Sequence, residues 1–341
     1  MSQDKVAVIV LTYNSLSKLG KGFLDRVVKS IFAQTYSNIE VIFVDNGSSD
    51  GTPDYLETIA RSRKNCRVLR LRRNYGWSGG NNREAILAKD TMYLFFMNDD
   101  VVLIDRDCIR KLVDTMSKHR DLGATQPLII NKDGSLNCGA DLGFSGFPKI
   151  LKQPRSYPVS EAFYVSGAAL LTRSDVFFRV GMFDEDLFLY RDDTDYSWRV
   201  RLLGYKCACI VDTKAYHWGS ATLGFGNPRF FYFFMRNNIW VIAKNSSLAW
   251  VLPRLFLMMI KVLIGYLGNV LLKEKEGKSA LFMLRGILEA LTNLRIAFSK
   301  RANIMKFRKV KEKYINRLMS TLIDIDLIFP RKLRRALKFR Q

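Results

Sequence analysis

The first 120 residues alternate short apolar runs with amphipathic segments, and this alternation restricts the fold more than any other feature of the chain. Residues 6–11 and 92–97 are apolar runs of strand length, as expected of buried strands, and residues 39–44 are a further predicted strand. Residues 19–34 and 52–61 repeat apolar side chains at helical spacing. This β-α-β-α order predicts an α/β fold with a mostly parallel sheet and helices on both faces, in which ligands bind beyond the carboxyl ends of the strands.

The same patterns predict the remaining elements of the first 247 residues. We expect a strand at residues 68–71, a helix at 79–89, a proline-rich loop at 149–158, a strand at 163–171 and an amphipathic segment at 196–203. Strand signals then end, and two or three helical segments follow from about Leu248. The chain therefore divides in composition near residue 247.

Polar residues follow three of the predicted strands at the point where each strand ends. The segments are Thr12-Tyr13-Asn14, Asp45-Asn46-Gly47-Ser48 and Asn98-Asp99-Asp100. Because the carboxyl ends of parallel strands share one edge of a sheet, we expect these three segments to converge on one crevice. Their joint occurrence is stronger evidence for a binding site than any one of them alone.

Asp99 and Asp100 are neighbouring carboxylates at the end of a buried strand. Side by side they repel, and burial removes their hydration, unless a cation lies between them. A hard divalent ion with oxygen ligands removes both penalties, and such an ion usually also holds phosphates. The alternative is an aspartate-rich turn leaving the sheet, because aspartate readily bonds its own backbone.

Asp45 also ends a buried strand, and the Asn-Gly-Ser-Ser that follows suits a turn and a helix N-cap. A capping turn accounts for the residues after Asp45 but not for Asp45 itself, whose carboxylate we expect to accept the imide N–H of a pyrimidine or guanine. Residues 74–82 are expected to form a glycine-rich loop that opens a helix. Backbone N–H groups of such a loop bind a diphosphate, and Arg73 and Arg83 flank it as cations for phosphate oxygens.

Taken in order, eight short motifs within residues 5–245 resemble the family-2 glycosyltransferases with the GT-A fold, and most of all their rhamnosyltransferase-like branch. The motifs are Thr12-Tyr13-Asn14, residues 44–52, residues 73–82, Asn98-Asp99-Asp100, residues 166–171, residues 181–185, Asp192-Asp193-Thr194-Asp195 and His217. Each motif alone is weak evidence, whereas eight in this order are specific. That branch elongates surface polysaccharides or lipid-linked oligosaccharides.

The resemblance implies a metal ion, Mn²⁺ or Mg²⁺, that bridges the diphosphate of a nucleotide-diphospho-sugar donor. It implies that Asp100 binds the ion, that Asp99 contacts the ribose or the ion, and that His217 is a further metal ligand. Because the chain has Asn-Asp-Asp where the family has an Asp-x-Asp pattern, the main ligand is left open between the two carboxylates. The residues expected to bind the donor are Thr12, Tyr13, Asn14, Asp45, Asn74, Gly80, Asn81, Arg83 and Asp99.

Asp193 aligns with the catalytic aspartate of the family, which implies that it is the general base for an acceptor hydroxyl. Many relatives have Glu-Asp where this chain has Asp192-Asp193, so Asp192 is a second candidate for that base. The alternative for this acidic cluster is an ordinary helix N-terminus, where negative charge interacts favourably with the helix dipole.

We therefore expect an inverting, metal-dependent enzyme that transfers one sugar to a polyprenyl-linked or glycan acceptor in the assembly of cell-surface polysaccharide, glycolipid or glycoprotein glycan. The sequence has no Gln-x-x-Arg-Trp element of processive synthases, which favours single-sugar transfer. Residues 1–247 are expected to form the catalytic domain, with a donor-binding half at about 1–120 and an acceptor half at about 121–247. The alternative is a non-catalytic membrane-peripheral scaffold with the same fold, but a scaffold has no need of the acidic set.

Most of the net charge of +22 lies at the end of the chain, because residues 248–341 contain 21 Lys/Arg and 6 Asp/Glu. Residues 248–272 are long and apolar enough to span a bilayer, but Lys261 near the centre would cost about 3 kcal/mol, and one span would contradict the positive-inside tendency. Residues 280–298 are amphipathic, with Leu281, Leu284, Leu288, Leu291 and Phe298 on one face. We expect this basic helical region to dock on an anionic membrane surface.

The main alternative for the basic helical region is a subunit interface that forms a homo-oligomer. No nucleic-acid partner is expected, because apolar helices have no use on a phosphate backbone. The sequence begins directly with a strand pattern and shows no signal peptide, and five irregularly spaced cysteines predict no disulfide framework. These features favour a cytoplasmic protein that is peripheral on the inner face of the cell membrane.

Overall fold

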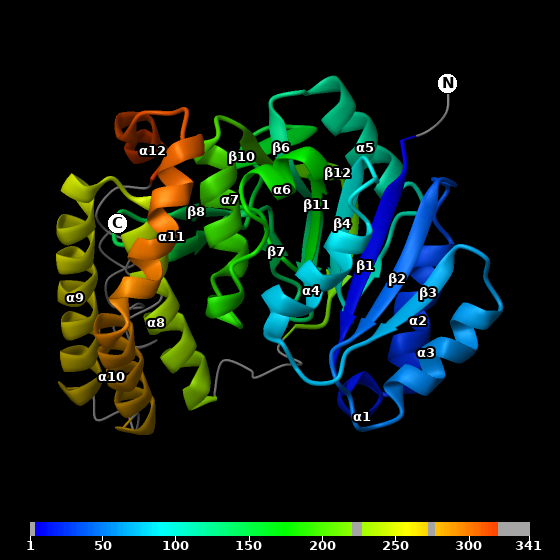
Figure 1. The fold of residues 1–341 in the computed structure, drawn as a ribbon, viewed down its shortest axis with the longest axis horizontal. Coiled ribbons are helices and arrows are strands. Elements are labelled where there is room, and N and C mark those ends of the chain that lie inside the picture. The colour runs from blue at the N-terminus through cyan, green and yellow to red at the C-terminus, as the bar shows by residue number, and fades with distance from the viewer. Residues whose placement is uncertain (1–3, 220–226, 272–276, 320–341) are drawn as a thin grey trace. The chain divides into compact units, whose positions relative to one another are not determined.

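The computed structural model describes residues 4–219, 227–271 and 277–319 and divides the chain into two compact units (Figure 1). The sheet unit comprises the residues up to Ala140 together with Ile150–Thr222. The helical unit comprises Asp141–Lys149 and the residues from Leu223 onward. The domain boundary expected at residue 247 stays a prediction.

The sheet unit is built on one mixed sheet with the strand order β10-β12-β6-β11-β4-β1-β2-β3, in which β5 also pairs with β12 and β7 with β6. Neighbouring strands β3, β2, β1 and β4 are parallel, as are β6 and β12, whereas β11 runs antiparallel between β4 and β6. This arrangement confirms the predicted α/β class. The strands are β1 (Val6–Thr12), β2 (Ile39–Asp45), β3 (Cys66–Arg70), β4 (Tyr93–Asn98), β5 (Val101–Leu103), β6 (Leu122–Asn131), β7 (Leu136–Asn137), β10 (Val159–Ala162), β11 (Ala169–Arg173) and β12 (Lys206–His217).

Helices cover both faces of this sheet, which explains why the central strands β1 and β4 are apolar almost throughout. Val6, Val8 and Val10 of β1 belong to a core shared with α2 and α5, while the alternate residues Ala7 and Ile9 are equally buried and point to the other face. The helices of the unit are α1 (Ser15–Leu19), α2 (Lys21–Phe32), α3 (Thr52–Arg61), α4 (Gly76–Leu87), α5 (Cys108–Lys118), α6 (Ser174–Arg179), the short 3-10 helix η1 (Glu185–Leu187) and α7 (Asp192–Leu202).

Two predicted elements have different bounds in the structure. Helix α4 begins at Gly76 and not at residue 79, so most of the expected glycine-rich loop is helical. Of the strand expected at residues 163–171, only residues 169–171 lie in a strand, which is β11, and a turn precedes them. The turn contains Gly167, whose backbone N–H bonds the Asp193 side chain at 3.1 Å, so a contact with a distant segment replaces local strand propensity.

The helical unit consists of the β8–β9 hairpin (Ala140–Leu142 and Pro148–Ile150, whose two end residues belong to the sheet unit) and five described helices. α8 is central within this unit, because α9, α10 and α11 all pack against it. The described residues from Leu248 onward thus form four helices, where two or three were expected for the whole region. Residues 331–340, which are part of the basic region expected to dock on a membrane, lie outside the described residues. The helices are α8 (Pro228–Asn245), α9 (Leu248–Leu271), α10 (Gly277–Thr292), α11 (Leu294–Phe307) and α12 (Glu312–Leu318).

Candidate active site

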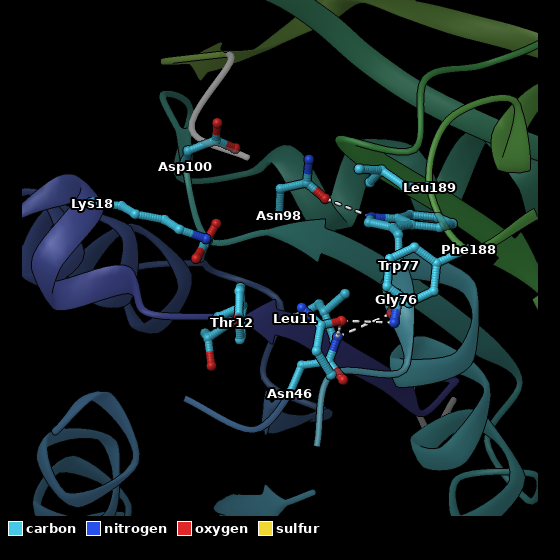
Figure 2. A pocket seen from close by; sticks show the side chains of 13 residues that line it. Leu11, Thr12, Lys18, Asn46, Gly76, Trp77, Asn98, Asp100, Phe188 and Leu189 are labelled. Carbon is cyan, nitrogen blue, oxygen red and sulfur yellow. Dashed lines mark hydrogen bonds between the residues drawn. The ribbon is translucent and has the colours of Figure 1, made fainter. Parts of the chain in front are cut away.

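The three polar segments converge at the carboxyl edge of the parallel strands, as predicted from the strand order. Thr12 at the end of β1 is in register with Asp45 of β2, and Leu11 is in register with Asn98 of β4. A pocket opens at this edge (Figure 2). Four of the residues expected to bind a donor line it, namely Thr12, Tyr13, Asn74 and Asp99, and Asp100 lines it as well.

Asp45 is buried beside this pocket, and one of its oxygens is unused. Oδ2 accepts the backbone N–H of Ser48 at 3.2 Å, whereas Oδ1 is inaccessible to solvent and has no hydrogen-bond partner in the described part of the chain. A buried carboxylate oxygen without a partner is costly, so this atom is suited to a ligand donor such as a base N–H.

Thr12 and Asn14 are largely occupied by the protein itself. Thr12 Oγ1 donates to the carbonyl of Val44 at 3.2 Å, which joins the ends of β1 and β2. Asn14 has a left-handed backbone with φ of 52°, and its Oδ1 accepts the N–H of Ser49 at 2.8 Å. Asn14 therefore ties the loop after β1 to the loop after β2, and of this segment Tyr13 and Thr12 are the residues that line the pocket.

A network of two asparagines positions the start of α4 against the strand ends. Asn46 Nδ2 donates to Asn74 Oδ1 at 3.1 Å and to the carbonyl of Gly76 at 3.0 Å (Figure 2). Asn46 Oδ1 in turn accepts the N–H of Tyr75 at 2.9 Å. Gly47 leaves room for this packing, since a Cβ there would lie 2.6 Å from the backbone of Arg73. The turn after β2 and the start of α4 are thus one rigid assembly.

Gly80, Asn81 and Arg83 lie within α4 and not in a phosphate-binding loop. A Cβ on Gly80 would overlap the Leu11 side chain, so this glycine permits close packing of α4 on β1. Asn81 is buried and its Nδ2 donates to the carbonyl of Trp77 at 2.9 Å. Arg83 pairs with Glu185 of η1 at 3.2 Å. None of these three residues lines the pocket.

Asp99 and Asp100 face different partners. Asp99 accepts a hydrogen bond from the Ser15 hydroxyl, and burial, with repulsion from Asp100, raises the pKa of Asp99 to about 7. Asp100 lies 3.3 Å from His217, measured from Oδ1 to Nε2, yet that Oδ1 is buried and makes no hydrogen bond. Burial lowers the pKa of His217, but the nearby Asp100 and Asp99 carboxylates outweigh it and raise the pKa overall.

The sheet brings Asp100 and His217 together across two strands that the sequence does not connect. β5 follows Asp100 and pairs with β12, with Val101 opposite His217, and the N–H of Trp218 donates to the carbonyl of Asp100 at 2.9 Å. One carboxylate oxygen and one imidazole nitrogen form half of a mixed metal site. Among the described residues no group of three or more His, Cys, Asp or Glu side chains has metal-binding geometry, so Asp99 does not join this pair.

The acidic cluster forms the first turn of α7, and its members have separate surroundings. Asp192 is buried and accepts a hydrogen bond from the Ser78 hydroxyl of α4, and burial raises its pKa to about 7. Asp193 is half-buried and accepts backbone N–H groups from Gly167 at 3.1 Å and Thr194 at 2.7 Å. Burial also raises the pKa of Asp193, although these bonds and Arg191 oppose the shift.

A strained segment connects the pocket to α7. Phe188, Tyr190 and Arg191 have positive φ angles of 63°, 67° and 70°, each of which costs about 1–3 kcal/mol for a residue with a side chain. The N–H of Trp77 holds the carbonyl of Phe188 at 2.7 Å, and Gly76 allows this approach because a Cβ there would overlap the same carbonyl. The strain is therefore stored where the chain passes from the pocket to Asp193.

Several pocket residues were not predicted from the sequence. Trp77 donates its indole N–H to Asn98 Oδ1 at 2.8 Å and forms one wall (Figure 2). Asn46, Gly76, Trp77 and Asn98 belong to motifs that the resemblance includes, so a role could have been suspected for them. Nothing in the local pattern marks Leu11, Lys18, Phe188 or Leu189. The unpredicted lining residues are Leu11, Lys18, Asn46, Gly76, Trp77, Asn98, Phe188 and Leu189.

Comparison with known proteins agrees with this geometry. The family model described as "Glycosyl transferase family 2" matches residues 7–177. An N-acetylglucosaminyl-diphospho-decaprenol L-rhamnosyltransferase of Mycobacterium tuberculosis is 27% identical over 245 residues, which cover 63% of this chain and 76% of the relative. The low-salt glycan biosynthesis hexosyltransferase of Haloferax volcanii is 21% identical over 85% of this chain and 92% of its own length.

Two solved structures share the fold over most of the chain. A mannosyltransferase from Pyrobaculum calidifontis, solved with GDP-Man and Mn²⁺, has a TM-score of 0.54 and 16% identity and covers 90% of this chain and 86% of its own. Residues 1–349 of TarS from S. aureus, solved with UDP, have a TM-score of 0.57 and 17% identity and cover 92% of this chain and 91% of their own. These similarities identify the architecture as GT-A-like.

Proposed function

Because the chain belongs to glycosyltransferase family 2 and so moves a sugar from a nucleotide-sugar donor, we propose that it transfers a single sugar, with inversion, to a polyprenyl-linked acceptor in glycan assembly. The observation that carries the proposal is the gathering of Asp45, Asp100, His217 and Asp193 on the carboxyl side of the strands, each with a distinct environment. The Mycobacterium tuberculosis relative is named for a decaprenol-diphosphate acceptor, which supports an acceptor of this class.

The residues present fit a divalent cation. Asp100 Oδ1 is a buried oxygen without a hydrogen bond, and His217 Nε2 is 3.3 Å from it, so both atoms are available to one ion of the Mn²⁺ or Mg²⁺ type. Carboxylate with imidazole favours Mn²⁺, and the Pyrobaculum calidifontis mannosyltransferase was solved with that ion. When bound, the ion would neutralise charge that develops on the leaving diphosphate. Asp99, which accepts a hydrogen bond from Ser15, would contact the ribose of the donor or the ion itself.

Asp193 is the proposed general base. Its Oδ2 is held by the N–H of Gly167, which fixes the carboxylate at the N-terminus of α7 while the residue stays half-buried and accessible. Because burial raises the pKa of Asp193, its carboxylate is a stronger base than that of an ordinary aspartate. Asp193 takes the proton of the acceptor hydroxyl, the hydroxyl oxygen bonds the anomeric carbon, and the bond from that carbon to the diphosphate breaks in line. One displacement inverts the anomeric configuration.

Asp192 is better suited to support than to proton transfer. Its carboxyl is buried and accepts a hydrogen bond from the Ser78 hydroxyl, so it connects α4 to α7 and is only 5% exposed. Asp45 is the proposed partner of the donor base through its unused Oδ1.

A panel of nucleotide sugars tests the reaction. Purified protein should release one nucleoside diphosphate in the presence of Mn²⁺ and a polyprenyl-diphosphate saccharide, and chelation should stop the release. The anomeric configuration of the product is read by NMR. Release from no donor in the panel, or a product with retained configuration, contradicts the proposal.

The helical unit is the proposed membrane contact. Within α9, residues 248–265 are long and apolar enough to cross a membrane, and only 22% of that window is buried. Its protein-facing side contains Val251, Arg254 and Met258, and the Arg254 guanidinium is fully buried, bonding Ser246 Oγ at 2.8 Å and Glu312 Oε1 at 2.6 Å. An α9 held in the protein by a buried arginine suits a helix that lies in the membrane surface better than one that spans it.

The opposite side of α9 and one side of α10 expose apolar stripes. On α9 Leu252 and Phe256 are 75% and 69% exposed, and the exposed set continues at helical spacing through Met259, Leu263 and Leu267. On α10 the predicted face is exposed, with Leu281, Leu284, Leu288 and Leu291 all more than half accessible, and Phe298 of α11 is partly so. Stripes of this kind beside basic residues fit an anionic lipid surface on the cytoplasmic side.

Full-length protein with charge placed on these stripes tests the membrane contact. The test variant carries Phe256→Glu, Leu263→Glu and Leu284→Glu, and the matched control carries the same change at three exposed apolar residues of the sheet unit, Ile86, Leu87 and Ile104. The test variant should no longer sediment with phosphatidylglycerol vesicles, whereas the control should. If both bind equally, the membrane role is wrong. If the test variant instead changes from oligomer to monomer in light scattering, the stripes are a subunit interface.

A further inference from the structure

The pocket contains one cation that no motif indicated. Lys18 lies in the last turn of α1 and is the only lysine or arginine among the described residues that line the pocket. Figure 2 shows its side chain extending from α1 toward the space between Thr12 and Asp100. Lys18 therefore approaches the pocket from the side opposite the Trp77 wall.

The charge of Lys18 is not neutralised by a salt bridge. Among the ion pairs of the described residues none includes Lys18, although Asp99 and Asp50 are near enough to affect it electrostatically. Its ammonium lies over the Tyr13 ring, 4.3 Å from the centroid, a contact that orients a cation without cancelling its charge. The nearest pocket carboxylate, Asp99, is bound instead by the Ser15 hydroxyl.

The cations expected for phosphate are elsewhere. Arg83 donates to the carbonyl of Gly79 at 2.6 Å and pairs with Glu185 at 3.2 Å, and Arg73 lies 5.0 Å from the Tyr75 ring centroid. Neither arginine lines the pocket. A diphosphate in this pocket would meet Asp99 and Asp100, so it needs positive charge from the protein as well as from an ion.

We infer that Lys18 binds the diphosphate of the nucleotide-sugar donor, on the side of the pocket opposite Trp77. This inference rests on the proposed function and names the residue that recognises the donor's charge. The lysine side chain has a flexible stem and a compact ammonium, so it can stay close to a phosphate oxygen as the leaving diphosphate gains charge. The ammonium acts as a point charge and requires no fixed hydrogen-bond geometry. Lys18 thus takes the place that the sequence assigned to the arginines around α4.

Inorganic pyrophosphate is the probe, because it carries the diphosphate without the unidentified base or sugar. Its inhibition constant is measured in competition with the nucleotide sugar identified by the panel. Pyrophosphate that binds to the basic helical unit then does not contribute to the constant. Lys18→Met should raise this constant by about 10- to 100-fold, the range for loss of one charge-assisted bond. Lys18→Arg should recover part of the loss, and inhibition by the bare nucleoside of that donor should be unchanged.

Lys21→Met is the matched control, since Lys21 lies three residues further on in α2, outside the pocket, with its ammonium 5.6 Å from the Tyr55 ring centroid. The inhibition constant of pyrophosphate for Lys21→Met should equal that for the wild-type protein. Thermal melting should show that all variants are folded. An unchanged constant in Lys18→Met, or an equal weakening of nucleoside and pyrophosphate, overturns the inference while the proposed function stands. If wild-type protein uses no nucleotide sugar at all, the proposed function and this inference fail together.

Discussion

Asp193→Asn separates catalysis from folding. The change keeps the size and shape of the side chain and removes the lone-pair basicity that proton transfer requires. A positioned general base contributes about 10²- to 10⁴-fold, so turnover should fall by that factor, which corresponds to about 2.7–5.4 kcal/mol of barrier at 1.36 kcal/mol per tenfold. Affinity for the donor should change little, because Asp193 does not line the pocket.

The effect of Asp193→Asn on stability should be much smaller. The carboxylate accepts one N–H on each oxygen, from Gly167 and from Thr194, and asparagine keeps one of the two acceptors. At most one bond is lost, at about 1 kcal/mol, while removal of a partly buried charge acts in the opposite direction. The melting temperature should therefore move by no more than about 2–4 °C.

Asp195→Asn is the matched control on the same helix. Asp195 is fully buried and pairs with Arg199 at 2.8 Å, so its loss leaves a buried guanidinium charge uncompensated and costs about 3–5 kcal/mol. This variant should melt much earlier yet keep its turnover per folded molecule. Initial rates of nucleoside diphosphate release and calorimetric melting distinguish the two. Wild-type turnover in Asp193→Asn refutes the assignment of the base.

The pH dependence gives a second measurement on the same residue. Asp193 is active when ionised, so kcat/KM should be highest above its pKa and fall as the pH drops through it. Because burial raises that pKa, the acid limb should lie above the ordinary range of aspartate. The limb should be absent from the residual activity of Asp193→Asn, and its persistence there would assign it to another group.

Three further perturbations have defined outcomes. Asp100→Ala with His217→Ala should abolish Mn²⁺-dependent turnover and Mn²⁺ binding in electron paramagnetic resonance, and full activity of the double variant excludes the pair as ligands. Burial raises the pKa of Asp192 to about 7, so its contribution to the free energy of unfolding is complete at low pH and is lost as the pH rises through 7. In denaturant titrations at several pH values, Asp192→Asn should flatten this decline. An unchanged pH profile in the variant contradicts the burial of the Asp192 carboxyl. Gly47 and Gly51 both have φ of +79°, so alanine at either costs about 1–2 kcal/mol of unfolding free energy. Gly47→Ala should cost at least about 2 kcal/mol more, because its Cβ meets the backbone of Arg73 whereas nothing crowds Gly51, and equal costs in urea titrations refute the clash.

The strand positions and the edge at which the site lies were readable from the sequence. Residues 6–11 are apolar without a break, which holds only for a strand covered on both faces, and Asp45 and Asn98 interrupt such runs where the strands end. The exposed stripe of α10 was equally readable, because side chains three and four positions apart share one face of a helix. These properties depend on residues close together in the chain.

Tertiary structure alone decided which member of each acidic pair faces which partner. Asp192 and Asp193 are adjacent in sequence, but one helical step turns one toward Ser78, 114 residues away, and the other toward Gly167. Asp100 likewise meets His217 only because β5 pairs with β12. No local pattern encodes such contacts, since their energy comes from the packing of distant segments.

The same reason explains the largest departure from expectation, at the start of α4. Glycines at residues 76–80 suggest a flexible loop by propensity, yet Asn46 and Phe188 bind this segment from both sides and hold it as a helix. Arg83 is thereby turned to Glu185, and Lys18 is the described cation that lines the pocket. The order of residues along the chain determined that this edge of the sheet is polar, whereas contacts across more than 25 residues of chain determined which side chains line the pocket.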